Sequence, residues 1–504
     1  MALEAQLIHD LLYDAVSTAP DVPAIRDATG VWSYRELSEA SHAFARWLRA
    51  RGLRPGDRLV VRLPSRRELV AMFYGASRCG VVFVPLNPAM KTFHLSSVLA
   101  NAEPALVVGE GEGLGSLRAA TEAPVRDARE IWAEVAGTAG QGRGADADDD
   151  VDVRPDDLAV LIYTSGSTSA PKAVMCAHAQ VVFATAAMQA ELGYRPDDVV
   201  FCRFPISWDY GLYKVLMSAV GRCELVLAGE EGDLTLLRRM REVGATIVPI
   251  VPSFAAMVVT MAGRDGAAPP PVRMFTNTGA ALPAATIDAL RDRFPGARVV
   301  RQFGLTECKR ISIMPPEQDR ERPGSVGRPL RGTTVEILGP DGAPVPAGEV
   351  GEIVVSGPHV MPGYWRLPEL TARTFRPDPR TGTPRLHTGD YGSVDEDGYL
   401  YFEGRRDDVF KRKGIRMSTL EIEAAAMDLP GVRGAAALPP GEGRDLAIVV
   451  AGDLAPREVL RGLAERLEPA KVPGICKVVD ELPLTQHGKN ARDALAGLLT
   501  AGTR

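Results

Sequence analysis

One stretch of this sequence decides its fold: Leu158-Ala159-Val160-Leu161-Ile162-Tyr163-Thr164-Ser165-Gly166-Ser167-Thr168-Ser169-Ala170-Pro171-Lys172. Its first five residues are apolar, which predicts a buried strand. The ten residues that follow contain five serines and threonines, one glycine and one lysine. Such a loop can offer backbone N–H groups, hydroxyls and a cation to a polyphosphate, although a plain surface turn has a similar composition. It is not a Walker-type loop, because it lacks the second glycine and the Ser/Thr after the lysine.

Composition limits the class of protein. A chain of 504 residues exceeds what one core usually supports, so we expect two or more domains. The net charge is -6 and the basic residues are spread among acids, which argues against nucleic acid as a partner. No apolar run is long enough to span a bilayer, no signal peptide is recognised, and the six cysteines are scattered without a CxxC pair. We therefore expect a cytoplasmic protein with reduced, mostly buried thiols and no membrane partner.

Around the opening stretch, helical and strand patterns alternate. Apolar residues recur at helical spacing between residues 34 and 53, and a Pro-Gly-Asp turn leads into a strand at residues 58–63. A helix at 68–79 and a buried strand at 81–86 follow. This alternation predicts a parallel α/β architecture. Residues 137–157, which are rich in Gly, Ala and Asp, are predicted to form a flexible surface loop.

Polar residues gather just after several predicted strands, where open α/β sheets place ligands. They follow strands at residues 199–204, 246–251 and 298–303. From Val335 the pattern changes to short strands with Gly/Pro/Asp turns, which predicts a β-rich subdomain. The last ~100 residues are enough for a small α+β domain.

Taken together and in this order, these segments resemble the AMP-forming adenylating superfamily, which includes acyl-CoA synthetases, stand-alone peptide-synthetase adenylation domains and luciferase. The resemblance covers roughly residues 10–500. It implies a large N-terminal domain of stacked α/β sheet subdomains plus the β-rich subdomain (residues 1–406), and a small mobile α+β C-terminal domain (residues 407–504) with a hinge near Asp407. It also implies an ATP-dependent ligase that joins a carboxylic acid to AMP with release of pyrophosphate, and then transfers the acyl group to a thiol.

The resemblance assigns a nucleotide site with ATP and Mg²⁺ as cofactors. The phosphate loop is represented by Thr164, Ser165, Gly166, Ser167, Thr168 and Lys172. Glu307 matches the acid that holds Mg²⁺, and Thr306 is expected to contact the α-phosphate. Gly279, Ala280 and Ala281 match the segment against adenine, and Phe303 is assigned to the same nucleotide site. Asp390 matches the acid that accepts both ribose hydroxyls, assisted by Arg405.

The small domain is expected to bring in Lys489, which bridges the substrate carboxylate and the α-phosphate and stabilises charge in the transition state. Gly414 and Arg416 lie in the stretch that faces the site after the small domain swings. Fifteen residues follow Lys489, so a carrier protein is expected to act in trans, and CoA is the other acceptor. Two positions depart from the family pattern in the phosphate loop, since Ser169 and Ala173 stand where glycine is usual. A further departure is Leu484, where arginine is usual.

A substrate pocket follows from the same resemblance, with Asp209 matching the acid that grips a substrate amino group. A helix N-cap is the structural alternative for Asp209. The other pocket positions are Tyr210, Tyr213, Ser253, Thr276, Thr278, Gln302, Arg310 and Ile311. Arg310 could bind a second substrate carboxylate, which favours an amino dicarboxylic or β-amino acid, or it could neutralise Asp209, which favours a plainer acid.

We therefore favour activation of an amino acid. The alternatives are a fatty or aryl acyl-CoA ligase, a specialised adenylating enzyme with a non-thiol acceptor, and an inactive nucleotide-binding protein. The last is disfavoured because Glu307, Asp390, Arg405 and Lys489 are all retained.

Overall fold

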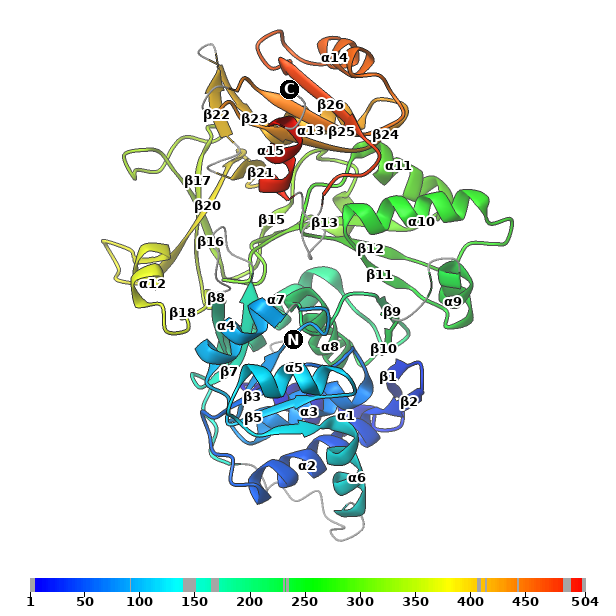
Figure 1. Ribbon diagram of the computed structural model, residues 1–504, viewed down its shortest axis with the longest axis vertical. Coiled ribbons are helices and arrows are strands. Elements are labelled where there is room, and N and C mark those ends of the chain that lie inside the picture. Colours follow the sequence, from blue (N-terminus) through cyan, green and yellow to red (C-terminus); the bar gives the residue numbers. More distant parts are fainter. Residues whose placement is uncertain are drawn as a thin grey trace.

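The computed structural model builds three large sheets and smaller sheets near the C-terminus (Figure 1). It describes residues 5–90, 92–138, 151–164, 172–229, 232, 235–405, 409–412, 415–441, 444–483 and 491–500. Over those ranges no helix has the length and apolar character needed to cross a membrane. All six cysteines are free thiols, and all but the partly buried Cys476 are buried, as the sequence predicts.

A seven-stranded sheet contains the apolar run before the Ser/Thr-rich loop, in the order β18-β8-β7-β4-β3-β5-β6. The predicted buried strand is β7, which pairs antiparallel with β8 and places Thr164 opposite Lys172. The strands are β3 (Arg58–Val61), β4 (Val82–Pro85), β5 (Leu106–Gly109), β6 (Val125–Asp127), β7 (Leu158–Thr164), β8 (Lys172–Ala177) and β18 (Gly363–Tyr364). Strands β3 to β7 pair in parallel, so the predicted parallel α/β arrangement is confirmed for this part of the chain.

A nine-stranded sheet forms the second layer, in the order β15-β14-β13-β12-β11-β9-β10-β1-β2. The strands are β1 (Pro23–Asp27), β2 (Gly30–Ser33), β9 (Val199–Cys202), β10 (Glu224–Leu227), β11 (Ile247–Ile250), β12 (Met274–Asn277), β13 (Arg298–Phe303), β14 (Ser312–Ile313) and β15 (Arg328–Pro329). Six neighbouring strands of this sheet are parallel, namely β13, β12, β11, β9, β10 and β1. Their carboxyl ends therefore lie along one edge.

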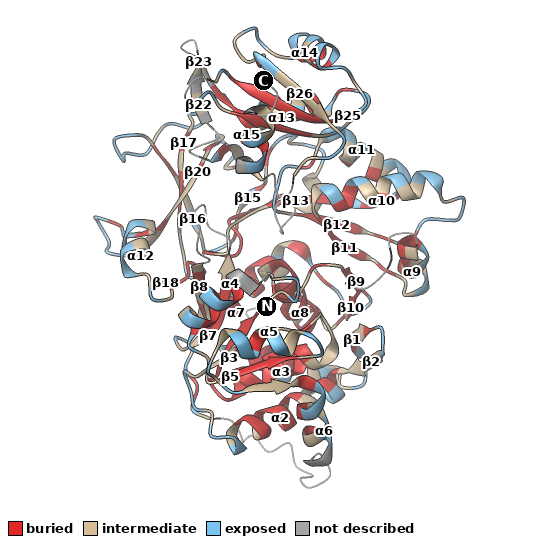
Figure 2. Ribbon diagram, viewed as in Figure 1, coloured by how far each residue is buried: buried red, intermediate tan, exposed pale blue. Residues whose placement is uncertain are grey.

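Helices pack on the two sheets around two cores (Figure 2). The larger core joins both sheets, and a smaller one lies between the seven-stranded sheet and the helices Thr92–Ala102 and Gly113–Ala120. Helix α2 begins at Tyr34 because Ser33 and Glu36 form a capping box. Helices α1 and α7 both contact α8, which begins at Asp209. The helices of this part are α1 (Ile8–Thr18), α2 (Tyr34–Ala50), α3 (Arg67–Arg78), α4 (Thr92–Ala102), α5 (Gly113–Ala120), α6 (Ala128–Thr138), α7 (His178–Leu192), α8 (Asp209–Gly221), α9 (Leu236–Glu242), α10 (Pro252–Arg264) and α11 (Ala284–Arg293).

The predicted β-rich subdomain is a five-stranded antiparallel sheet. Its strands are β16 (Thr334–Leu338), β17 (Gly351–Ser356), β19 (Phe375–Pro377), β20 (Pro384–Val394) and β21 (Leu400–Arg405), with helix α12 (Pro368–Thr374) beside β19. Strand β20 is the long central strand of this sheet, and it presents Asp390 next to Arg405 of β21.

The C-terminal part has a small core of its own, which includes Ile422, Val450 and Leu463. Its elements are β22 (Val409–Arg412), β23 (Ile415–Ser418), α13 (Thr419–Met427), β24 (Val432–Leu438), β25 (Ala447–Gly452), α14 (Pro456–Ala464), β26 (Ile475–Val479) and α15 (Arg492–Thr500). This mixture of helices and strands agrees with the predicted α+β domain. The proposed hinge residue Asp407 lies outside the described residues, so the boundary between 406 and 407 remains a prediction.

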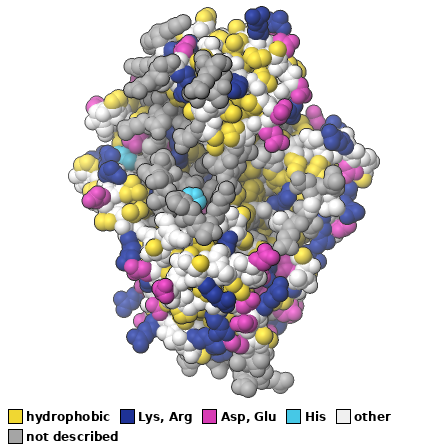
Figure 3. Space-filling view, viewed as in Figure 1, with side chains coloured by type: hydrophobic (Ala, Val, Ile, Leu, Met, Phe, Trp, Pro, Cys, Tyr) yellow, Lys and Arg dark blue, Asp and Glu magenta, His cyan; other side chains and the backbone are white. Residues whose placement is uncertain are grey.

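On the face drawn in Figure 3, acidic and basic side chains are interspersed among apolar and other polar side chains. This distribution matches the mixed charge pattern read from the sequence.

Candidate active site

Several predicted site residues lie just past the carboxyl ends of parallel strands in the nine-stranded sheet. Asp209 follows β9, Ser253 follows β11 and Thr278 follows β12. Phe303 ends β13, and Glu307 lies four residues beyond it. The topology therefore gathers residues that are far apart in sequence along one edge, the position at which open α/β sheets bind ligands.

A three-residue cluster joins this edge to the seven-stranded sheet. Lys172, at the start of β8, places its Nζ 2.9 Å from Oε1 of Glu307. The Tyr364 hydroxyl donates to the same Oε1 at 2.6 Å and accepts from Lys172 Nζ at 2.8 Å. We call Lys172, Glu307 and Tyr364 the lysine–acid cluster. It unites two of the residues predicted for the phosphate and metal site with one that the sequence did not reveal.

Electrostatics keep Glu307 charged in this cluster. Burial of the carboxylate opposes ionisation, but the Lys172 charge and the hydrogen bonds from Tyr364 and Lys172 outweigh it and hold the pKa of Glu307 below its ordinary value. A buried carboxylate that stays ionised is a strong ligand for a cation.

A second acid lies on the five-stranded sheet. Asp390 is buried, and its Oδ1 lies 3.3 Å from Nε of Arg405, whose side chain is half exposed. The two residues face each other across β20 and β21. The structure therefore brings together the two residues that were predicted to hold the ribose.

The segment predicted to lie against adenine is exposed. Gly279 adopts φ +88°, a left-handed conformation that favours glycine. Ala280 and Ala281 follow it on the surface, and the Asn277 side chain donates to the Ala280 carbonyl at 2.9 Å. Phe303 stacks near Phe402, with ring centroids 4.8 Å apart.

A second charged cluster occupies the predicted substrate pocket. Asp209 accepts from Nζ of Lys309 at 3.2 Å. It is the first residue of α8, and Trp208 occupies the N-cap position, so the N-cap alternative for Asp209 is wrong. Lys309 is 2 % exposed along its side chain, whereas Asp209 is 26 % exposed. The ion-pair partner of Asp209 is thus Lys309, and Arg310 instead donates to Thr278 Oγ1 at 2.6 Å.

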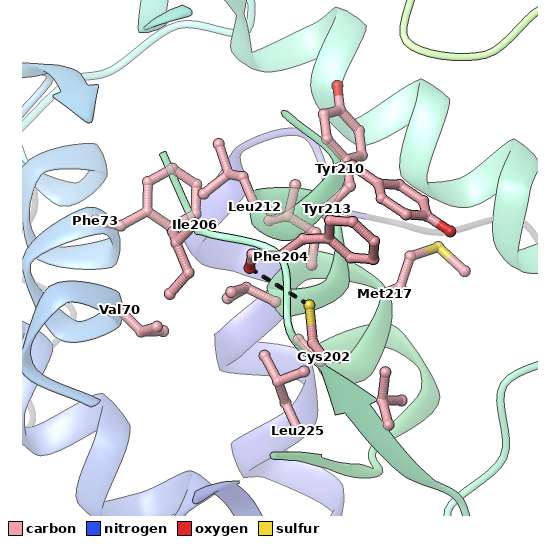
Figure 4. Close-up of a cluster of buried hydrophobic side chains, with 14 of the residues drawn as sticks. Val70, Phe73, Cys202, Phe204, Ile206, Tyr210, Leu212, Tyr213, Met217 and Leu225 are labelled. Atoms are coloured by element: carbon pink, nitrogen blue, oxygen red, sulfur yellow. Dashed lines mark hydrogen bonds between the residues drawn. The ribbon is translucent and has the colours of Figure 1, made fainter. Parts of the chain in front are cut away.

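Aromatic rings pack against this charged cluster. Lys309 Nζ lies 4.3 Å from the Tyr213 ring centroid, a cation–π contact. Tyr210 donates to the Thr276 carbonyl at 2.5 Å, and its ring packs 4.9 Å from Phe204. Figure 4 draws the buried hydrophobic side chains around these rings. Phe204, Tyr210 and Tyr213 lie on the opposite side of that hydrophobic cluster from Val70.

Some polar side chains at and next to the predicted pocket positions have no protein partner among the described residues. Among the described residues, the hydroxyls of Tyr213 and Ser207 and both amide atoms of Gln302 are buried and make no hydrogen bond within the protein. Buried polar atoms are nearly always satisfied, so these positions are suited to a polar ligand or water. Tyr213 and Gln302 were both predicted to line the pocket.

Burial shifts the proton affinity of the lysines here. It lowers the pKa of Lys309 to about 8, although Asp209 acts in the opposite direction. Lys214 on α8 is 3 % exposed and donates to the Tyr194 hydroxyl at 3.2 Å, and burial lowers its pKa to about 7. Lys309, Lys214 and Tyr364 were not predicted from the sequence. The sequence offers no signal for Lys309 beyond its place next to Arg310.

The remaining predicted residues are less informative. Ser253 is exposed at the start of α10, Thr306 is partly buried beside Glu307, and Ile311 is fully buried. Ala173 is a buried residue of β8 opposite Tyr163, so alanine is accommodated there in regular strand geometry. The positions outside the described residues or side chains are Ser165, Gly166, Ser167, Thr168, Ser169, Gly414, Arg416, Leu484 and Lys489.

The sequence model described as AMP-binding enzyme matches residues 12–365, and the model described as AMP-binding enzyme C-terminal domain matches residues 421–489. The chain belongs to the AMP-binding enzyme family. Relatives in this family are ligases and synthetases that form acyl-adenylates, so this AMP-binding enzyme is an adenylate-forming acid ligase that uses ATP.

Three comparisons show the range of similar AMP-binding enzymes. A feruloyl-CoA synthase of Amycolatopsis sp is 30% identical over 94% of each chain. The solved structure of VinN is 56% identical, with a TM-score of 0.75, and the match covers 79% of this chain and 98% of VinN. VinN has also been solved in complex with L-aspartate and with 3-methylaspartate. ATP-bound MatB from Rhodopseudomonas palustris is 28% identical, with a TM-score of 0.87 over 98% of each chain.

Proposed function

We propose that this enzyme activates an amino dicarboxylic acid of the aspartate type as its acyl-adenylate and then transfers the acyl group to a thiol. The observation that carries the proposal is the charge set of the pocket. One carboxylate, Asp209, lies in it with two buried cations, Lys309 and Arg310. A substrate with one ammonium and a second, non-reacting carboxylate complements this set charge for charge.

The ion pair between Asp209 and Lys309 indicates which residue would meet each charge of the substrate. A substrate ammonium that binds Asp209 replaces Lys309 as its partner. Lys309 is almost fully buried, so it then requires another anion, because an unpaired buried charge is strongly unfavourable. The second carboxylate of the substrate supplies that anion, and Arg310 can add a bidentate contact. The similarity to VinN, which was solved with L-aspartate and 3-methylaspartate, supports the same substrate class.

The proposed nucleotide site lies on the other side of Glu307. Lys172 and the loop before it bind the β/γ-phosphates, Thr306 contacts the α-phosphate, and Asp390 with Arg405 binds the ribose. Gly279, Ala280, Ala281 and Phe303 border the adenine.

Within the described residues no group of three or more His, Cys, Asp or Glu side chains is arranged to hold a metal ion by itself. Mg²⁺ in nucleotide sites is commonly held by one or two carboxylates together with phosphate oxygens, and a single buried, ionised Glu307 fits that arrangement. When bound, Mg²⁺ neutralises phosphate charge. Glu307 would supply the carboxylate to Mg²⁺. Lys172, released from its ion pair with Glu307, could then turn to the phosphates.

In the first step, an oxygen of the reacting carboxylate bonds to the α-phosphorus of ATP and the bond to the β-phosphate oxygen breaks, which releases pyrophosphate. Lys489 stabilises the negative charge that is shared between the two reacting groups. In the second step, a thiol attacks the acyl carbon, loses its proton and displaces AMP. We propose that residues 407–504 rotate about Asp407 between the steps, which brings Gly414 and Arg416 to the thiol.

An aryl acyl-CoA ligase is the second candidate, because Tyr210 and Tyr213 line the pocket and a feruloyl-CoA synthase is among the relatives. The deciding experiment is ATP–pyrophosphate exchange with L-aspartate, 3-methylaspartate, L-alanine, malonate and ferulate. We expect exchange to be fastest with the amino dicarboxylic acids. Faster exchange with ferulate would establish the aryl ligase instead, and ATP binding without exchange for any acid would favour an inactive nucleotide-binding protein. Thioester formation with CoA or with a separate carrier protein then identifies the acceptor.

A further inference from the structure

The Tyr364 hydroxyl lies at the centre of the lysine–acid cluster. We propose that Tyr364 is a positioning residue of the nucleotide site, which orients the Glu307 carboxylate and remains its partner when Lys172 moves to the phosphates. This inference rests on the roles proposed above for Glu307 and Lys172. It adds a residue that the sequence did not indicate.

The backbone around Tyr364 is held by both layers that meet at the cluster. Strand β18 pairs with β8, and this pairing sets Tyr364 beside Val174, two residues after Lys172. The Met361 amide donates to the Glu307 carbonyl at 2.9 Å. Tyr364 is therefore tied through the main chain to the strand that carries Lys172 and to the segment that carries Glu307.

The ring itself has little freedom. Tyr364 is 3 % exposed and packs edge-on against Phe375, with centroids 5.5 Å apart. Its backbone N–H donates to Thr371 Oγ1 at 3.0 Å. A hydroxyl on a ring held this way is fixed before any ligand binds, which is the condition for orienting a neighbouring group accurately.

The hydrogen-bond chemistry assigns separate tasks to the two contacts. A phenol has one proton to donate, and Tyr364 donates it to Glu307 Oε1 while its oxygen accepts from Lys172. If Lys172 leaves for an anion, Glu307 keeps a charge-assisted hydrogen bond and stays aimed at the position of the departed amine. A cation that arrives there meets a carboxylate that is already oriented.

Outer-sphere partners of this kind typically change metal affinity by about 10- to 100-fold when they are removed. Tyr364→Phe deletes only the hydroxyl and keeps the ring, so the cation–π contact to Lys172, at 4.2 Å, is retained. We expect this variant to bind ATP in the presence of Mg²⁺ about 10-fold more weakly, as measured by titration calorimetry without any acid substrate.

A double-mutant cycle with Glu307→Gln tests whether the effect passes through the acid. In that background, Tyr364→Phe is expected to change the affinity less than about twofold. Tyr399→Phe is the matched control, because Tyr399 is equally buried and its hydroxyl donates to Gln318, outside the cluster. It is expected to bind ATP and Mg²⁺ as the unmodified enzyme does.

The outcomes separate this inference from the proposed function. Unchanged affinity in Tyr364→Phe, or an equal loss in both backgrounds, overturns the role of Tyr364. Unchanged affinity in Glu307→Gln overturns the proposed role of Glu307, and the inference with it. The acid specificity is tested separately by the exchange panel, since no acid is present in the calorimetry.

Discussion

Replacing Lys309 with methionine removes one charge from the proposed substrate pocket and keeps most of the side-chain volume. At 3.2 Å, the attraction between Lys309 and Asp209 is about 5 kcal/mol at an effective dielectric constant of about 20. Part of this is offset by the desolvation of Lys309, and Asp209 keeps 26 % of its side-chain surface exposed. We therefore expect Lys309→Met to weaken the binding of the substrate's second carboxylate by about 3 kcal/mol. This corresponds to about a 100-fold loss in kcat/KM.

The assay compares kcat/KM for ATP–pyrophosphate exchange with L-aspartate and with L-alanine. In Lys309→Met, exchange with aspartate should fall about 100-fold, because its second carboxylate loses a buried cation. Alanine has no second carboxylate, so its rate should fall much less. Methionine has no more freedom than lysine at the left-handed backbone of this position, φ +59°, so the backbone strain is unchanged.

Lys214→Met is the matched control. It removes a similarly buried amine that bonds to Tyr194 and not to Asp209. The control should leave the ratio of aspartate to alanine exchange unchanged. The proposed role of Lys309 is ruled out if Lys309→Met leaves that ratio unchanged, or if both lysine variants lower it equally.

Further predictions concern Asp209, Lys489 and the titration of Lys309. Asp209→Asn should slow exchange with amino acids by at least about 10-fold and leave acids without an amine, such as malonate, less affected; equal loss for both would return Asp209 to a structural role. Lys489→Ala should abolish adenylate formation while calorimetry still detects ATP binding, and normal exchange would remove Lys489 from the first step. Because burial lowers the pKa of Lys309 to about 8, kcat/KM for the dicarboxylic acid should fall as pH rises above about 8, and Lys309→Arg should move that fall to higher pH. The free energy of unfolding should change in the opposite sense. The pKa of Lys309 is about 8 in the folded protein and 10.5 ordinarily, so the unfolded state binds more protons between pH 8 and pH 10.5. The free energy of unfolding from denaturant titrations should therefore rise across that pH range, as the cost of burying Lys309 diminishes.

The alternation of helix and strand patterns was enough to predict the parallel α/β layers, since each buried strand and each amphipathic helix is a local feature of the sequence. The β-rich subdomain was readable for the same reason, from short strands separated by turn residues. The order of strands within a sheet was not, because it depends on which apolar faces pack together over long separations. Strands β9 and β11, for example, pair directly although β10 lies between them in the chain.

The site was predicted unevenly. Glu307 and Asp390 were assigned through the resemblance, and the structure places each beside a cation. Lys309 was missed because its side chain reaches Asp209 from a left-handed backbone conformation, which is rare for a residue other than glycine and leaves no pattern in the sequence. Tyr364 was missed because its partners lie 57 and 192 residues away, and its place among them comes from the pairing of β18 with β8.

The distribution of the proposed nucleotide-binding residues over three sheets has a consequence for protein engineering. Lys172 belongs to the seven-stranded sheet, Asp390 to the five-stranded sheet, and Glu307 follows the nine-stranded sheet's β13. Bound ATP would contact all three sheets. At 100 times its Kd it would add about 2.7 kcal/mol to the free energy of unfolding of the part that contains them. A graft that exchanges the segments around β9 to β13 for those of a relative would carry in both the specificity pocket and Glu307, and leave Lys172 and Asp390 in the host. The rate of adenylate formation in such a graft would then depend on the contacts between the sheets. The hydrogen bonds of Tyr364 to Lys172 and Glu307 are among those contacts.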